Sequence, residues 1–148
     1  DAPFRDTDDL IENEQGKSVS QIFLEQGEAE FRSMEKRVLR DELLRDGAVL
    51  ALGGGAPVSL DAQSALRAIS SYIIFLDISL STVAPRIGFN RDRPLLLDNP
   101  RGTWQNLMQE RRPIYELLAD ATIHVDNRSE EDIVDIAFSH LTEAGVVQ

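Results

Sequence analysis

Apolar residues follow two spacings along this chain, and the two alternate. Spacings of three and four residues predict amphipathic helices, whereas short unbroken apolar runs are typical of buried parallel strands. The helices are predicted over residues 8–15, about 19 or 21 to 26, 28–45, 61–69, 81–88, 103–119 and 129–143. The strands are predicted over residues 4–5, 48–52, 72–78 and 122–126. Single helices separate the later strands, so the pattern predicts an α/β fold with a parallel sheet covered on both faces.

Two connecting segments interrupt this pattern. Residues 89–102 combine charged residues and two prolines with no helical period, and we expect a mobile loop there. The triplet Gly16-Lys17-Ser18 matches the end of a phosphate-binding loop, but Ile11 stands where that motif needs its first glycine. We therefore expect Gly16 to end one helix and Ser18 to begin the next.

Composition limits the class of protein. A chain of 148 residues with 42% hydrophobic and 28% charged residues predicts one compact domain over residues 1–148. The 15 basic and 26 acidic residues give a net charge of −11, which disfavours nucleic acids and anionic membranes as partners. The absence of cysteine excludes disulfides and thiolate chemistry and agrees with a cytoplasmic location. No apolar run approaches the length of about 20 residues that a membrane span needs, and we expect no signal peptide.

The first candidate chemistry follows the first strand. Asp6 and Asp8 lie where that strand gives way to a helix, at the edge where open α/β sheets bind ligands. One carboxylate could hold a hydrated Mg²⁺ and the other could accept a hydrogen bond from a substrate hydroxyl. Capping of the helix by these acids is the alternative.

Arginines and glycines provide further candidates. Arg32 has Glu28 and Glu35 at helical spacing, which suits either a fixed guanidinium or a plain surface ion pair. The run 53–55 is three glycines after a predicted strand, where a ligand could approach backbone N–H groups, or a flexible turn could form. Arg91 and Arg93 beside Pro94 could close over a phosphate.

The helix at 103–119 and the two histidines complete the candidates. Arg111 and Arg112 could serve a substrate carboxylate or merely solvate a helix face. His124 and His140 have no carboxylate neighbour in the pattern, so we expect structural roles rather than a zinc site or a catalytic triad.

Several of these pieces occur in one order, and together they resemble the shikimate kinase family. They are D-T-D from Asp6, F-L-x-x-G-E-x-E-F-R-x-x-E from Phe23, L-G-G-G from Leu52, R-P-L-L from Arg93 and R-x-P-x-Y from Arg111. The resemblance extends from residue 6 to at least residue 126. It implies a three-layer α/β/α P-loop kinase fold with a parallel sheet. It also implies transfer of the γ-phosphoryl group of ATP to the 3-hydroxyl of shikimate, a step of aromatic amino-acid biosynthesis.

The resemblance assigns roles to charged residues of the substrate side. Asp8 matches the carboxylate that binds the shikimate hydroxyls and orients or deprotonates the attacking one. Asp6 matches the acid that holds Mg²⁺ through water. Arg32 and Arg111 match the arginines that clamp the shikimate carboxylate, and Glu35 matches the residue that positions Arg32.

The same resemblance makes residues 18–46 the substrate-binding helices. Within the pocket it implies, Gly54 and Gly55 supply backbone contacts to the ring hydroxyls, and Phe23 and Phe31 form the apolar walls.

On the nucleotide side, the resemblance makes residues 89–102 a lid loop. Arg93 matches the lid arginine that reaches the transferring phosphate, where charge stabilisation matters most. Arg86 matches the residue that stacks on adenine. The implied ligands are ATP, Mg²⁺ and shikimate, and the family expectation is a monomer.

Two features depart from the family pattern. Residues 127–131 contain no proline where the adenine loop usually has one. In addition, the strand, Walker A loop and helix that open the family's sequence have no counterpart here, and their backbone and lysine normally hold the phosphates. We expect that the natural protein has this segment and that the present chain is truncated.

Two alternatives remain at this point. A different small-molecule P-loop kinase, such as a gluconate kinase, would share the fold, but the paired Arg32 and Arg111 with three glycines favour shikimate. A non-catalytic shikimate-kinase-like binding protein would explain the missing Walker loop. The joint retention of Asp6, Asp8, Arg93 and Arg111 counts against it.

Overall fold

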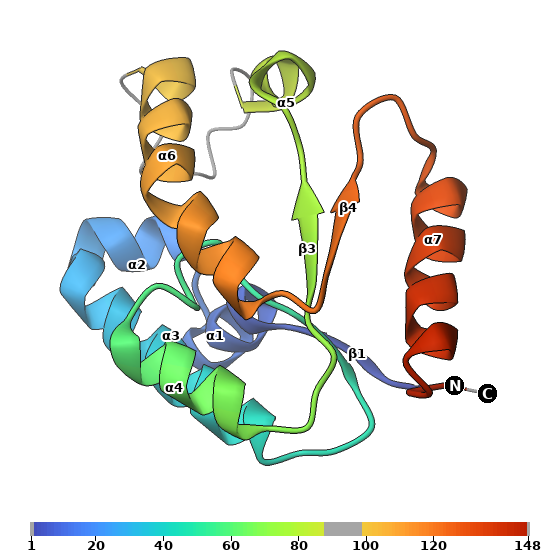
Figure 1. The fold of residues 1–148 in the computed structure, drawn as a ribbon. Coiled ribbons are helices and arrows are strands. Elements are labelled where there is room, and N and C mark those ends of the chain that lie inside the picture. Colours follow the sequence, from blue (N-terminus) through green and yellow to red (C-terminus); the bar gives the residue numbers. More distant parts are fainter. Residues whose placement is uncertain (1, 88–98, 148) are drawn as a thin grey trace. The chain divides into compact units, whose positions relative to one another are not determined.

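A computed structural model describes residues 2–87 and 99–147 of the chain. They divide into two compact units, one formed by residues 2–69 and the other by residues 70–87 and 99–147 (Figure 1). Over these ranges, none of the helices combines the length and the apolar character needed to cross a membrane.

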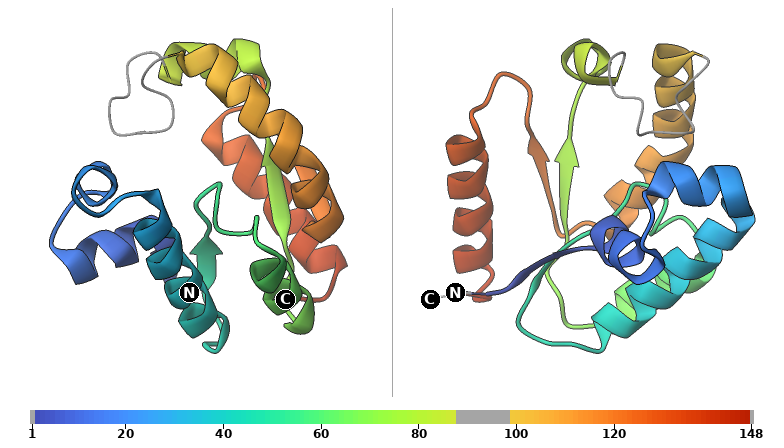
Figure 2. Two further views of the ribbon diagram at one scale, coloured as in Figure 1. Left: turned by 90° about the vertical axis from the view of Figure 1, so that its left-hand side faces the viewer. Right: turned by 180° about the vertical axis from the view of Figure 1, so that it is seen from behind.

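The first unit holds two strands and four helices. They are β1 (Phe4–Asp6), α1 (Thr7–Gln15), α2 (Val19–Gln26), α3 (Glu28–Leu43), β2 (Val49–Ala51) and α4 (Leu60–Ala68). The strands β1 and β2 are parallel, and Asp6 lies opposite Ala51. The long helix α3 runs alongside α1, α2 and α4 (Figures 1 and 2).

The core of this unit forms where the apolar faces of α1, α2 and α3 meet. Its buried members are Ile11, Ile22, Phe31, Met34 and Val38, and Leu10, Val19 and Phe23 pack against them. The members on α3 recur every three or four residues, which places them on one helix face.

The junction between α1 and α2 confirms the predicted caps. Gly16 ends α1 in the left-handed region at φ 63°, which glycine adopts without a side-chain clash. Ser18 begins α2 with a capping box, in which its hydroxyl accepts from the Gln21 backbone N–H. No phosphate-binding loop is formed by this triplet, because it joins two helices.

The second unit holds the parallel pair β3 (Ile74–Asp77) and β4 (Ala121–His124) with three helices. The helices are α5 (Leu80–Ile87), α6 (Pro100–Leu118) and α7 (Glu130–Glu143). The helices α5 and α6 contact each other, and α7 contacts β4 (Figure 2). Buried Val83 on α5 packs with Trp104 and Leu107 on α6.

The predicted alternation of parallel strands and helices is confirmed, with small shifts of the element ends. One boundary prediction is wrong, because the expected loop 89–102 ends earlier. The helix α6 begins at Pro100, and the Asn99 side chain caps it by accepting from the Gly102 N–H at 3.2 Å. Proline suits the first helical position, where its missing N–H would have no partner. Residues 88–98, most of the predicted lid, lie outside the described residues.

Candidate active site

Asp6 and Asp8 lie at the carboxyl end of β1, as predicted. Asp6 has extended backbone and caps α1, because its Oδ1 accepts from the Asp8 N–H at 2.8 Å. Between them, buried Thr7 accepts from the Gly53 N–H at 3.0 Å through its hydroxyl. This hydrogen bond ties the start of α1 to the glycine loop that follows β2. Asp6 therefore caps the helix, as the alternative predicted, and Asp8 also lies at the strand edge.

The carboxyl group of Asp8 is held in an unusual state. Its Oδ1 is buried and has no hydrogen-bond partner among the described residues. Burial, followed by the negative charges of Asp6, Glu35 and Glu12, raises the pKa of Asp8 to about 6, although nearby Arg32 lowers it. A carboxylate with a pKa near neutrality and an unused oxygen is suited to accept a proton from a bound hydroxyl.

Arg32 is fixed on several sides by residues of α2 and α3. Its guanidinium donates to nearly buried Glu35 at 2.8 Å and to exposed Glu28 at 3.4 Å. The same group lies 5.5 Å from the ring centroid of Phe31 and 6.0 Å from that of Phe23. The two rings themselves are 4.8 Å apart. The aromatic residues therefore lie against the arginine, and the ion pairs with Glu28 and Glu35 that helical spacing predicts are present.

The glycine loop 53–55 meets both charged groups closely. A Cβ atom at position 55 would lie 2.1 Å from Nη1 of Arg32, and one at position 53 would lie 2.8 Å from Oδ1 of Asp8. A side chain at these positions would displace the Arg32 guanidinium or the Asp8 carboxylate, so close approach favours glycine here in addition to turn flexibility. The sequence pointed to the whole run 53–55, but the roles taken from the resemblance covered Gly54 and Gly55 and left Gly53 out.

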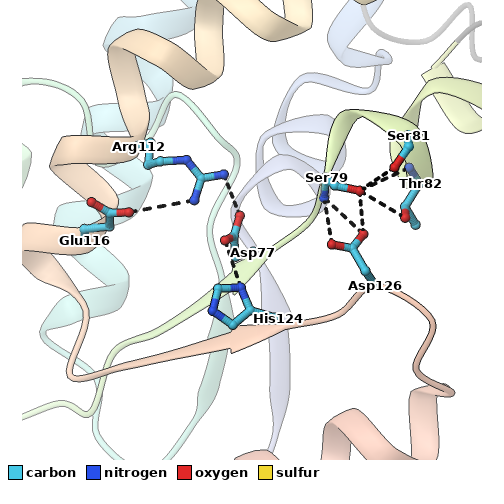
Figure 3. A network of polar contacts seen from close by, with 8 residues as sticks. All are labelled: Asp77, Ser79, Ser81, Thr82, Arg112, Glu116, His124 and Asp126. Atoms are coloured by element: carbon cyan, nitrogen blue, oxygen red, sulfur yellow. Dashed lines mark hydrogen bonds and ion pairs between the residues drawn. The ribbon is translucent and has the colours of Figure 1, made fainter.

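A second polar network lies in the other unit, at the carboxyl ends of β3 and β4 (Figure 3). The Asp77 carboxylate accepts from Arg112 at 2.6 Å and lies 3.0 Å from Nδ1 of His124. The guanidinium of Arg112 also lies 5.6 Å from the Phe75 ring centroid and 3.7 Å from Glu116. The hydrogen bond from Arg112 is the main reason that the pKa of Asp77 lies below its ordinary value.

This network corrects one premise from the sequence. We expected no carboxylate beside His124, but the parallel pairing of β3 and β4 places Asp77 directly opposite it. The two residues are far apart along the chain, so only the register of the sheet could have revealed the pair. The His124 side chain remains 74% exposed.

The remaining predicted residues lie in the second unit or outside the described residues. Arg111 is half-buried on α6, one residue before Arg112, and Arg86 is exposed in the last turn of α5. Arg93 lies outside the described residues. The structure therefore brings together Asp6, Asp8, Phe23, Phe31, Arg32, Glu35, Gly54 and Gly55 in the first unit.

The part of the chain that the structure describes contains no metal site made only of protein groups. Among residues 2–87 and 99–147, no group of three or more His, Cys, Asp or Glu side chains could hold a metal ion. Mg²⁺ commonly keeps several waters and uses one or two carboxylates together with substrate phosphates. One carboxylate, such as that of Asp6, would be enough for a site in which Mg²⁺ keeps its waters.

Fold and site together define a class of protein. Parallel strands with helices, a carboxylate poised near neutrality and a fixed guanidinium at the strand ends describe an α/β enzyme for a small, negatively charged substrate.

Sequence comparisons give the family. The family model described as shikimate kinase matches residues 1–142. The shikimate kinase of Streptomyces coelicolor is 39% identical over 134 residues, which cover 90% of this chain and 77% of that protein. The shikimate kinase of Salinispora tropica is 41% identical over 135 residues, which cover 90% of this chain and 80% of that protein. The chain belongs to the shikimate kinase family.

Solved structures agree with this assignment. A shikimate kinase from Acinetobacter baumannii in complex with shikimate matches with a TM-score of 0.91 at 28% identity, over 97% of this chain and 80% of that chain. The shikimate kinase of Aquifex aeolicus matches with a TM-score of 0.78 at 32% identity, over 97% of this chain and 83% of that chain. The fold is thus the α/β fold of P-loop kinases, and the protein is a small-molecule kinase, a transferase that uses ATP.

Proposed function

We propose that Asp8 is the catalytic base of this shikimate kinase. It would accept a hydrogen bond, and then the proton, from the 3-hydroxyl of shikimate as that oxygen attacks the γ-phosphorus of ATP, while the bond from this phosphorus to the bridging oxygen breaks and ADP leaves. The single observation that carries this role is the buried, unpartnered Oδ1 of Asp8 on a carboxyl group whose pKa is about 6. A group with these properties is ionised at pH 7 and can still bind a proton.

The shikimate carboxylate is assigned to Arg32 and Arg111. Arg32 is held by Glu35 at 2.8 Å, so its guanidinium is already oriented before substrate arrives. An arginine that need not reorganise loses less side-chain entropy when it binds a carboxylate in the two-pronged geometry. The rings of Phe23 and Phe31 lie against this guanidinium and are assigned to the apolar walls of the same pocket.

The ring hydroxyls are assigned to the glycine loop. The backbone of Gly54 and Gly55 would contact them, as the resemblance implies. The closeness of position 55 to Arg32 and of position 53 to Asp8 supports this role, because the loop, the clamp and the base form one cluster. A ligand anchored at Arg32 by its carboxylate would meet the loop and Asp8 with its hydroxyls.

The nucleotide side is assigned from the resemblance to the family. Arg86 would stack on adenine, and Arg93 of the lid would stabilise the charge on the transferring phosphoryl group. Asp6 would hold Mg²⁺ through water, and the ion would neutralise phosphate charge when bound. A monomeric state and a cytoplasmic location stay predictions.

The test is a coupled kinase assay of the full-length protein with MgATP and shikimate, with gluconate as the alternative acceptor. We expect turnover with shikimate and none with gluconate. Turnover with gluconate and none with shikimate would contradict shikimate as the substrate and favour a gluconate kinase. Calorimetric binding of shikimate without any turnover would support a non-catalytic binding protein and contradict the proposal.

A further inference from the structure

Asp126 joins two loops that are far apart in the sequence. Its carboxylate accepts from the Ser79 backbone N–H at 3.1 and 3.2 Å through its two oxygens, and from the Ser79 hydroxyl at 2.9 Å (Figure 3). Ser79 precedes α5, and Asp126 follows β4. The carboxylate therefore ties the start of a helix to the loop that leaves the neighbouring strand.

Ser79 in turn organises the first turn of α5. Its carbonyl oxygen accepts from the Val83 N–H at 3.0 Å, and its hydroxyl oxygen lies 3.4 Å from the Thr82 N–H and 3.2 Å from the Thr82 hydroxyl. Hydrogen bonds from Thr82 and from Ser79 lower the pKa of Asp126, so the carboxylate is ionised near neutral pH. A charged acceptor at a helix start is also favoured by the helix dipole.

The loop that leaves Asp126 is itself folded back. The Arg128 N–H donates to the Val125 carbonyl at 3.3 Å, and Nε of Arg128 donates to the His124 carbonyl at 2.9 Å. Asn127 between them has φ 57°, the left-handed region that asparagine tolerates better than most residues. The loop and α5 thus share one anchor at the carboxyl edge of β3 and β4, where α/β sheets bind ligands.

We propose that Asp126 is a positioning residue for the nucleotide, acting through α5 and the loop after β4. This inference rests on the proposed function, because Arg86, the residue assigned to adenine, lies in the last turn of α5. If the anchor is lost, α5 and the loop are free to move apart, and their contacts with the nucleotide weaken. Asp8 on α1 and Arg32 on α3 lie in the first unit, whereas this anchor lies in the second, and its hydrogen bonds do not involve α6, which carries Arg111.

The chain offers a matched control at Asp120. Its Oδ2 accepts from the Ile73 N–H at 2.7 Å, so this carboxylate also joins two segments that are far apart in the sequence. Ile73 precedes β3 and Asp120 precedes β4, so the contact lies at the amino ends of these strands, away from α5 and from the loop after β4. A comparison of Asp126→Asn with Asp120→Asn therefore separates positioning from a general loss of stability.

The experiment is steady-state kinetics of the full-length protein, together with binding of ADP measured by calorimetry. We expect Asp126→Asn to raise the KM for MgATP and the Kd for ADP about tenfold, the scale of one lost hydrogen bond to a charged group. The KM for shikimate and kcat should stay within about twofold of wild type, and Asp120→Asn should leave the two nucleotide constants unchanged.

A second variant covers the event that Asp126→Asn does not fold. Ser79→Ala removes only the hydroxyl, and it should raise the same two constants in the same direction. Equal nucleotide constants for wild type, Asp126→Asn and Ser79→Ala in an active enzyme would overturn the positioning role while leaving the kinase assignment intact. A wild-type protein that binds ADP but does not phosphorylate shikimate would instead contradict the proposed function, and the ADP constants would still decide the inference.

Discussion

Replacing Asp8 with Asn is expected to stabilise the fold while removing most of the activity. The folded protein raises the pKa of Asp8 from 3.8 to about 6, so it favours the protonated form of this side chain more than the unfolded chain does. Above pH 6 the carboxylate must nevertheless be ionised, and its burial beside other acids then opposes folding. A neutral amide of the same shape removes that cost.

The magnitude follows from the shift of the pKa. A difference of roughly two pKa units corresponds to at most about 3 kcal/mol, at about 1.4 kcal/mol per unit. Asp8 is only half-buried, so solvent screens part of this energy, and a gain on the order of 1 kcal/mol is expected. For a chain of this length that is a rise in Tm of about 2–4 °C. The rate kcat should fall about 10²–10⁴-fold, as for other removed general bases.

The assay is thermal unfolding of wild type and Asp8→Asn between pH 3 and 8. The variant should melt higher at pH 8, and the difference should disappear between about pH 6 and pH 3.8, the folded and ordinary pKa values of Asp8. Asp9→Asn is the control, because Asp9 is exposed in the same helical turn. A lower Tm for Asp8→Asn at pH 8, or a gain that does not depend on pH, would refute the reasoning.

Three further changes test other parts of the structure. Gly55→Ala should raise the KM for shikimate at least about tenfold with a folded circular dichroism spectrum, because the new Cβ would occupy the place of the Arg32 guanidinium. Arg111→Ala should raise the KM for shikimate strongly with less effect on the KM for ATP, and equal losses for both substrates would contradict its role. Ile11→Ala should lower the free energy of unfolding by about 2–5 kcal/mol in urea titrations, because Ile11 is fully buried in the core of the first unit.

Local chemistry explains why much of the fold was predictable. Gly16 and Ser18 mark their helix ends through backbone conformation and a side-chain hydrogen bond, and both effects act within a few residues. The same holds for Arg32 and Glu35, which meet because three residues make almost one helical turn. Interactions of this range are visible in the order of residues.

Contacts that depend on sheet register were not predictable. Asp77 meets His124 only because β3 and β4 pair in one particular alignment, and Ser79 meets Asp126 for the same reason. The start of α6 at Pro100 was missed because glycine and charged residues obscure the helical period in its first turn. The elevated pKa of Asp8 could not be predicted from the sequence either, since it depends mainly on burial.

Carboxylates lie at the carboxyl ends of three of the strands, and their different surroundings explain why Asp8 is the one proposed as the base. Asp77 accepts a hydrogen bond from the guanidinium of Arg112, and Asp126 accepts hydrogen bonds from a serine and a threonine. These bonds lower the pKa of both carboxyl groups, which serve as fixed acceptors. Asp8 faces Gly53, which has no side chain to offer it, and its nearest charges are mostly negative. Its unused hydrogen-bonding capacity is therefore available to a ligand. The glycine loop therefore supports the role proposed for Asp8, because Gly53 offers no side-chain partner to its Oδ1.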